Sequence, residues 1–390
     1  MDIISMDREY VAGTYGRFPV ELVSGKGSIV TDVNGKEYID MGSGIGVTCF
    51  GFGDEAWSAA VAEQAARLQH TSNLYYTEPC ARLAKLLCER TGMKKVFFAN
   101  SGAEANECAI KVARKYSAMK KGSDCYTIVT LVNSFHGRTL TTLAATGQDH
   151  FHKDFQPLTP GFIHVPANDI AALEAAVAEH QVAGVMMEVI QGEGGVNALD
   201  QQYLMAADKL CHDNDIPFII DEVQTGNGRT GKLYGYMNFK ISPDIVSTAK
   251  GLGGGLPIGA CMMNEKTEAV LGYGDHGSTY GGNPVCCAGA LSVIERLDNT
   301  FLAEVQAKSE YVFSALTGAP GIESVSGLGL MIGIKTTAPA ADVVRECMNR
   351  GVLCLTAKDK VRLLPALNIP MDDLEYAIET IKAVAKELAK

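Results

Sequence analysis

Lys250 and Asp221 are the residues whose types and positions most strongly indicate chemistry in this chain. Each closes a short apolar run, 245–248 before the lysine and 217–220 before the aspartate. An amine in that position is a candidate nucleophile for a Schiff base, although such a lysine can also extend its ammonium group to solvent. A carboxylate at the end of a buried strand needs a buried cation as its partner. The two residues therefore predict Schiff-base chemistry beside a buried positive charge.

Small residues between the apolar run 95–99 and a helical pattern over 103–120 form a candidate phosphate site. Ser101, Gly102 and Ala103 would leave free N–H groups at the positive end of the helix dipole. Taken alone, the segment favours a simpler interpretation, a helix capped by Ser101, and it matches no common nucleotide-binding motif. Beside Lys250 and Asp221, it completes the set of groups that pyridoxal phosphate needs.

Two further loops follow predicted strands and carry an aromatic ring or charges. Phe135 could stack on a flat ring and Arg138 could hold a carboxylate with two hydrogen bonds, although a surface arginine explains that loop equally well. Glu188 lies inside the apolar run 185–190, and Glu193 lies on the glycine-rich turn after it. Because buried glutamates usually need partners, this acidic pair favours a functional site.

The elements that must position these residues are strands alternating with helices. We expect seven strands, at 95–99, 126–132, 161–165, 185–190, 217–220, 245–248 and 258–263. Such alternation is typical of a mainly parallel sheet, whose carboxyl ends bind ligands. Residues 28–40 predict a hairpin with a type I′ turn at Asn34 and Gly35. We predict an α/β fold with a large domain at 51–285 and a smaller α/β domain from both chain ends, 1–50 and 286–390.

The composition excludes several other classes of protein. With 34 Lys and Arg against 45 Asp and Glu, the formal charge is −11, which is unfavourable for binding nucleic acid. No apolar run is long enough to cross a bilayer, and we expect neither a signal peptide nor a membrane partner. The 11 cysteines show no CxxC motif, and His150 and His152 have no nearby ligand partners, so we expect reduced thiols and no metal. These features predict a cytoplasmic protein.

The chain resembles the class III (subgroup II) pyridoxal-phosphate-dependent aminotransferases of fold type I. The resemblance covers nearly the whole chain and includes the segment around Lys250 and residues 35–40, 100–107, 135–139, 191–195, 221–226 and 278–284. Within the family, residues 72–76, 135–138 and 362–365 are most similar to members that act on N2-acetyl-L-ornithine. The resemblance thus implies transfer of an amino group from that substrate to 2-oxoglutarate, in arginine biosynthesis.

The resemblance also implies roles for residues around the cofactor. Lys250 would form the Schiff base and then move a proton, Asp221 would keep the pyridine nitrogen protonated, and Gln224 would bond the phenolic oxygen. Phe135 would stack on the ring, and the phosphate would bind at Ser101, Gly102 and Ala103. Thr279 would reach the phosphate in the partner subunit, so the family implies a homodimer with shared sites.

For the substrates, the resemblance implies an arginine and a movable ion pair. Arg138 would bind the α-carboxylate. Glu193 would cover Arg362 until a dicarboxylate displaces it, and Tyr15 matches a position that contacts substrate.

Other functions stay open at this point. They are ω-aminotransferases for ornithine, succinylornithine or 4-aminobutyrate, an isomerase of the glutamate-1-semialdehyde aminomutase type, and a catalytically silent cofactor-binding protein. Ile45 argues against free ornithine, because enzymes for that substrate tend to have a tyrosine there. The Glu193–Arg362 pair argues against an aminomutase, and the intact Lys250 and Asp221 argue against a silent protein.

Overall fold

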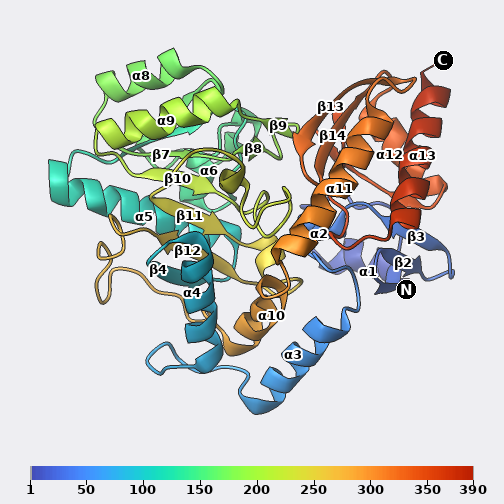
Figure 1. The fold of residues 1–390 in the computed structure, drawn as a ribbon, viewed down its shortest axis with the longest axis horizontal. Helices are drawn as coiled ribbons and strands as arrows, with labels where there is room; N and C mark the ends of the chain where they lie inside the picture. The colour runs from blue at the N-terminus through green and yellow to red at the C-terminus, as the bar shows by residue number, and fades with distance from the viewer. Residues whose placement is uncertain (1, 390) are drawn as a thin grey trace.

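The computed structural model describes residues 2–389, which form two parts lying side by side (Figure 1). The larger part holds a seven-stranded sheet in the order β4-β12-β11-β10-β7-β5-β6. Its strands are β4 (Lys95–Ala99), β5 (Thr127–Leu131), β6 (Phe162–Val165), β7 (Val182–Met187), β10 (Phe218–Asp221), β11 (Ile245–Thr248) and β12 (Gly259–Met263). β12 runs antiparallel to its two neighbours, β4 and β11, and the other six strands share one direction. The predicted α/β fold with a mainly parallel seven-stranded sheet is confirmed.

Successive residues of these strands enter two different hydrophobic clusters. Ile219 packs in the cluster that contains residues of α5 (Gly102–Lys121), whereas Ile220 packs in the cluster that contains residues of α8 (Ile170–Glu179) and α9 (Gln201–Asp213). Helices therefore cover both faces of the sheet, which explains why its strands read as unbroken apolar runs.

The smaller part combines the first and the last portions of the described chain, drawn blue and red in Figure 1. The parallel pairing of β15 with β3 completes a sheet in the order β1-β2-β3-β15, and a second sheet has the order β13-β14-β17-β16. The strands are β1 (Leu22–Lys26), β2 (Ile29–Asp32), β3 (Glu37–Asp40), β13 (Ile322–Leu328), β14 (Met331–Thr336), β15 (Val352–Leu353), β16 (Leu355–Ala357) and β17 (Lys360–Leu363). The helices near them are α1 (Ile3–Tyr10), α11 (Asn299–Leu316), α12 (Ala340–Asn349) and α13 (Met371–Leu388). The domain boundaries at residues 50 and 285 stay a prediction.

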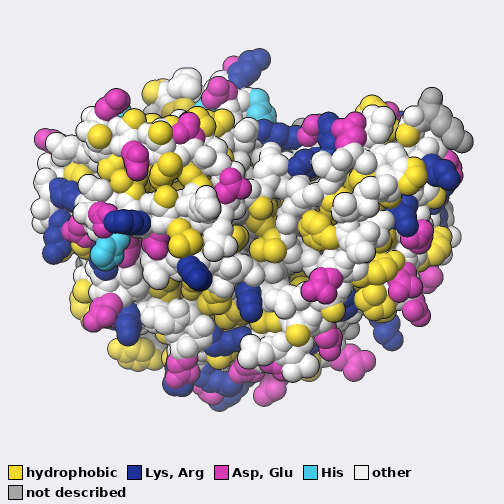
Figure 2. Space-filling view, turned by 45° about the horizontal axis from the view of Figure 1, so that its top comes forward, with side chains coloured by type: hydrophobic (Ala, Val, Ile, Leu, Met, Phe, Trp, Pro, Cys, Tyr) yellow, Lys and Arg dark blue, Asp and Glu magenta, His cyan; other side chains and the backbone are white. Residues whose placement is uncertain are grey.

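Short elements and three longer helices complete the chain. They are α2 (Ser43–Gly46), α3 (Glu55–Arg67), α4 (Glu78–Thr91), α6 (Leu140–Ala145), α7 (Asp149–His152), β8 (Ile190–Gln191), β9 (Asn197–Ala198), η1 (Gly235–Asn238), η2 (Lys250–Leu252) and α10 (Pro284–Ile294). None of the helices within residues 2–389 is long and apolar enough to cross a membrane. Acidic and basic side chains intermingle over the face drawn in Figure 2.

Two local expectations are wrong. β7 ends at Met187, so Glu188 follows the strand instead of lying inside it. The hairpin between β2 and β3 forms, but its loop has four residues, 33–36, and Gly35 alone among them has a positive φ, at 80°. A type I′ turn needs positive φ at both central residues, so this turn has another type, with Gly35 as its left-handed residue.

Candidate active site

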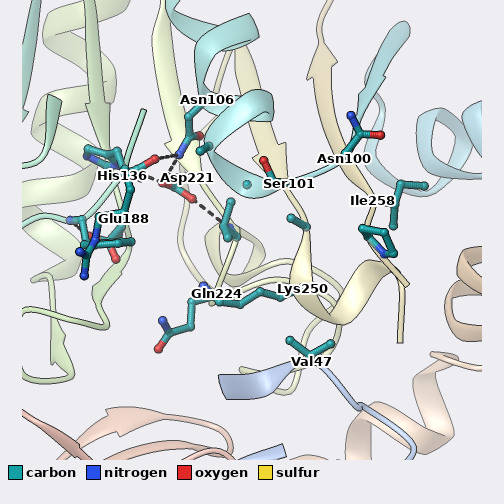
Figure 3. Close-up of a pocket in the computed structure, with 18 of the residues that line it drawn as sticks. Val47, Asn100, Ser101, Asn106, His136, Glu188, Asp221, Gln224, Lys250 and Ile258 are labelled. Carbon is teal, nitrogen blue, oxygen red and sulfur yellow. Dashed lines mark hydrogen bonds and ion pairs between the residues drawn. The ribbon is translucent and has the colours of Figure 1, made fainter. Parts of the chain in front are cut away.

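A cavity of about 500 Å³ opens at the carboxyl edge of the large sheet. Because β4, β5, β7, β10 and β11 run in the same direction, the segments that follow them meet at this edge. Ser101, Phe135, Asp221 and Lys250 line the cavity, as the sequence predicted from their positions at or after the ends of strands, and Glu188 lines it as well. Figure 3 shows Asp221 beside Asn106 and His136 on one side, with Lys250 and Gln224 on another.

Asp221 is buried and held by three donors from different segments. Its Oδ2 accepts a hydrogen bond of 2.8 Å from Asn106 Nδ2 and lies 2.8 Å from His136 Nδ1, and its Oδ1 accepts one of 2.9 Å from the Val223 amide. Asn106 Nδ2 also donates to His136 O at 2.7 Å, so one amide fixes both neighbours. A carboxylate offers about four acceptor positions. Asp221 can therefore accept one further donor from the cavity that it lines.

Glu188 holds two loops of the site by their backbones. Its Oε1 accepts from the Phe135 amide at 2.9 Å and its Oε2 from the Gly192 amide at 3.2 Å. Burial, followed by the charge of Asp221, raises the pKa of Glu188 well above its ordinary value, against the two amide bonds. This buried acid therefore has its partners in the backbone of the two neighbouring loops.

Lys250 faces Asp221 from a strained turn. Its φ is +45°, a conformation that costs roughly 1–2 kcal/mol for a residue with a side chain. Burial lowers the pKa of Lys250, although Asp221 and Glu193 oppose that effect. A lowered pKa makes the neutral amine, which is the nucleophilic form, more abundant.

The first turn of α5 forms a cradle that only a glycine fits. Ser101 caps the helix by accepting the Glu104 amide at 3.2 Å. The amides of Gly102 and Ala103 lie in the first turn, where N–H groups have no partner inside a helix. A Cβ on Gly102 would lie 2.6 Å from Val223 Cγ1, and Val223 lines the same cavity. Val223 therefore packs closely against Gly102, beside the free amides of Gly102 and Ala103. Free amides at the start of a helix are a geometry that binds phosphate.

Glu193 and Arg362 form an ion pair between the two parts of the molecule. Glu193 Oε1 lies 2.5 Å from Arg362 Nη1, and Gln224 bridges them, donating to the glutamate and accepting from the arginine at 3.3 Å each. Burial opposes the charge of Glu193, but Arg362 outweighs it and holds the pKa of Glu193 below its ordinary value. Arg362 Nε is buried without a hydrogen-bond partner. The pair predicted from the sequence is thus brought together, with Arg362 arriving from β17.

Arg138 lies against aromatic rings at the mouth of the cavity. Its guanidinium is 4.2 Å from the centre of the Phe151 ring and 5.6 Å from that of Phe135. Within residues 2–389 the structure gives Arg138 no acidic partner, so the guanidinium is available to an anion.

Four predicted site residues are not among those that line the cavity. Glu193 and Arg362 contact the lining residue Gln224, whereas Thr279 and Tyr15 lie elsewhere. Thr279 is exposed and does not line the cavity, although its neighbour Ser278 accepts a hydrogen bond from Asn100 Nδ2 at 3.1 Å. Tyr15 is exposed and packs against Arg17. Ile45, which argued against free ornithine, also lies outside the lining, where Val47 takes its place. The proposed roles of Thr279 and Tyr15 stay predictions.

Sequence reasoning assigned no role to Asn106, His136 or Glu222. Asn106 stands one turn after Gly102 on the same face of α5, which was a usable signal for a polar group aimed at the site. Glu222 is fully buried and accepts hydrogen bonds from Thr225 Oγ1 and from the Gly235 and Tyr236 amides, at 2.6 to 2.8 Å. Burial raises the pKa of Glu222 to about 7.

The family model and the similar proteins of known sequence are all aminotransferases. A family model described as aminotransferase class-III matches residues 10–385. The chain is 52% identical over 388 residues to the acetylornithine aminotransferase of Haemophilus ducreyi, covering 99% of each chain. It is 43% identical to the enzyme of that name from Methanocaldococcus jannaschii, covering 99% of this chain and 98% of the other.

Solved structures with the same fold include enzymes with two different names. The ornithine aminotransferase of Toxoplasma gondii superposes with a TM-score of 0.94 at 32% identity, covering 98% of this chain and 94% of that one. The N-acetylornithine aminotransferase of Stenotrophomonas maltophilia superposes with a TM-score of 0.85 at 33% identity, covering 98% of each chain.

Proposed function

Because this chain belongs to the class-III aminotransferases, we propose that it transfers the terminal amino group of N2-acetyl-L-ornithine to 2-oxoglutarate. The products are N-acetyl-L-glutamate 5-semialdehyde and L-glutamate, and the reaction belongs to arginine biosynthesis. The observation that carries the proposal is the 52% identity, over almost the full length of both chains, to an acetylornithine aminotransferase. The superposition on an ornithine aminotransferase supports the same fold and the same family.

Pyridoxal phosphate fits the residues that line the cavity. Asp221 offers a carboxylate that can accept one more donor, and Lys250 offers an amine. The first turn of α5 offers two free amides, and Gly102 in that turn cannot be replaced without a clash. The cofactor supplies an aldehyde that takes up the amino group and a ring that withdraws electrons from the reacting carbon. Ser101, Gly102 and Ala103 would hold its phosphate, Phe135 would stack on its ring, and Asp221 would hold its protonated nitrogen.

Lys250 is the residue we propose for proton transfer. Its Nζ takes the proton from the substrate carbon that bears the reacting amine. Burial lowers the pKa of Lys250, which brings a general base closer to the pH at which it works. Asn106 and His136 hold the Asp221 carboxylate in place, and that carboxylate would bind the protonated nitrogen of the cofactor.

Arg138 and the Glu193–Arg362 pair are the groups we propose for the substrates. Arg138, free of acidic partners among residues 2–389, binds the α-carboxylate. With Arg362 paired to Glu193, the acylated amine meets no bare charge in a desolvated pocket. When 2-oxoglutarate enters, its second carboxylate replaces Glu193 on Arg362. Gln224 bonds both members of the pair, and we propose that it guides this exchange.

We also propose that the protein works as a cytoplasmic homodimer. Leu74, Tyr75, Tyr76 and Tyr280 are exposed, and Asn73 Nδ2 ties their two segments together by donating to Ser278 O at 3.0 Å and Gly281 O at 2.9 Å. Such a cluster of exposed aromatic side chains supports an interface. Thr279 lies inside the second of these segments, next to Tyr280, which agrees with a role for it in a partner's site.

The test is coupled turnover of four amine donors with 2-oxoglutarate: acetylornithine, succinylornithine, ornithine and 4-aminobutyrate. We expect acetylornithine to have the highest kcat/KM. A higher value for ornithine or 4-aminobutyrate would contradict the proposed substrate and leave the aminotransferase assignment intact. Isomerisation of glutamate 1-semialdehyde without a keto acid would favour an aminomutase.

A further inference from the structure

The backbone turn that carries Lys250 is rich in glycine, which makes it flexible, and Lys250 itself has a strained conformation. Lys250 has φ +45°, and the glycines that follow it include Gly254 at +59° and Gly255 at +135°. Glycine permits many conformations, so this sequence alone does not hold the turn in one of them. Something outside the turn must therefore fix the direction of the Lys250 side chain.

Three side chains donate to alternate carbonyls of this turn. Asn227 Nδ2 donates to Ala249 O at 3.0 Å, Cys49 Sγ to Gly251 O at 3.7 Å, and Trp57 Nε1 to Gly253 O at 3.0 Å. The donors come from three segments: the loop after β10, the loop before α3, and α3 itself. We propose that Asn227, Cys49 and Trp57 form a clamp of positioning residues that aims Lys250 at the cavity.

The packing of the clamp supports this role. Asn227 and Cys49 are 1% and 2% exposed, so their donors have no competing water. A Cβ on Gly251 would lie 2.7 Å from Cys49 Sγ, and one on Gly254 would lie 2.9 Å from Trp57 Nε1. The glycines thus allow the clamp side chains to approach the backbone closely. The hydrogen bonds of the clamp in turn restrict the conformational freedom of the glycines.

Asn227 contributes more than one bond. Its Nδ2 also donates to Thr248 Oγ1 at 3.0 Å, so it grips the last residue of β11 and the residue before Lys250 together. The backbone carbonyl of Asn227 lies 3.8 Å from Cys49 Sγ, so the single S–H of Cys49 is shared between Asn227 O and Gly251 O.

The proposal rests on the role proposed for Lys250, and the test separates the two. Borohydride reduction of the wild-type holoenzyme and peptide mapping should place the cofactor label on Lys250. A label on a different lysine would overturn the proposed function, and the clamp with it. With Lys250 labelled, the variants Asn227→Ala and Trp57→Phe test the clamp alone.

The expected result is faster hydrogen exchange in holoenzyme peptides that cover residues 249–256, together with slower chemistry. Displacement of a reacting group by less than 1 Å already costs rate, so kcat should fall about tenfold in each variant. KM should stay within about twofold, because the clamp does not touch substrate. Trp57→His retains a ring N–H at a similar distance from the backbone and should recover part of the lost kcat.

Ser117→Ala is the matched control. It also removes a buried side-chain bond to a backbone carbonyl, from Ser117 Oγ to Ala183 O at 3.0 Å, but far from the Lys250 turn in the sequence. Its kcat and its exchange at 249–256 should match the wild type. If Asn227→Ala and Trp57→Phe behaved like Ser117→Ala in both measurements, or lowered kcat without faster exchange at 249–256, the clamp would be overturned.

Discussion

At the scale of single residues, the groups of the site are held in place by neighbouring side chains and backbone amides. Asn106 and His136 fix the Asp221 carboxylate, Glu188 fixes two loops by their amides, and Glu193 already covers Arg362. A site whose groups are held in advance loses little free energy to reorganisation when substrate arrives. The functions proposed for these residues can be tested one at a time.

Glu193→Ala tests the ion pair with Arg362. Without its partner, Arg362 lies open in a buried pocket, so 2-oxoglutarate and glutamate should bind more tightly. The half-reaction with acetylornithine should slow, because the pocket then carries a bare charge beside an acylated substrate. Stopped-flow measurement of each half-reaction checks this, with the exposed Glu174→Ala on α8 as control. Equal slowing of both half-reactions would contradict the exchange mechanism.

Glu222→Gln tests the buried acid behind Asp221. Burial raises the pKa of Glu222 from 4.5 to about 7, so between these values the folded protein holds a proton that the unfolded chain releases. Its contribution to stability is therefore complete below about pH 4.5 and falls as pH rises to 7, by at most about 3 kcal/mol. Glutamine stays neutral, so the variant should lose less stability than the wild type over this range.

Urea denaturation at pH 5 and at pH 7.5 measures that difference. The surface variant Glu304→Gln on α11 serves as control and should follow the wild type. Parallel pH dependence of Glu222→Gln and the wild type would show that Glu222 does not titrate in this range.

At the scale of elements, much of the architecture was predictable from the sequence. β4 and β11 begin and end at the predicted residues, because the chain there changes sharply between apolar residues and small or polar ones. Lys250, Asp221, Phe135 and the start of α5 were predictable as site residues, since each lies at or just after the end of a strand. His136 was not, because its role depends on where α5 and the β5 loop meet in space, whereas Asn106 could have been found from its spacing of one helical turn from Gly102. The position of Glu188 was missed for a local reason, an apolar Val189 that extended the run beyond the end of β7.

Gly102→Ala tests the first turn of α5 as an element. The new methyl group would lie 2.6 Å from Val223 Cγ1, so the turn must move away from the position that we propose for the phosphate. We expect cofactor affinity to fall by at least about tenfold, as for the loss of one charged hydrogen bond. Titration of the cofactor-free protein with pyridoxal phosphate measures the affinity.

Gly184→Ala in β7 is the control for that change. Its methyl group would meet Ala113 Cβ and Ile128 Cδ1 at 3.1 Å, inside the core and away from the cavity. It should lower thermal stability and leave cofactor affinity unchanged. If both variants weakened cofactor binding alike, the effect of Gly102→Ala would be general destabilisation.

At the scale of the whole molecule, the site is assembled from both parts of the chain, and we propose that a second subunit completes it. Mixing inactive Lys250→Ala and Thr279→Ala subunits tests this. If Thr279 serves the partner's phosphate, each mixed dimer has one site with both changes and one intact site, so activity should return on subunit exchange. No recovery would show that each chain builds its phosphate site alone.

The pairing of β15 with β3 has a consequence for how the protein is made. Lys36, next to β3, donates from Nζ to Asn349 O, 313 positions later. A ribosome that adds about 5–20 residues per second takes roughly 15–60 s to cover that distance. Through that interval the nascent hairpin of β2 and β3 has an open edge, while the seven-stranded sheet can already close. The edge of the hairpin thus stays exposed while the rest of the chain is made, and premature termination before β15 would leave that edge open to aggregation.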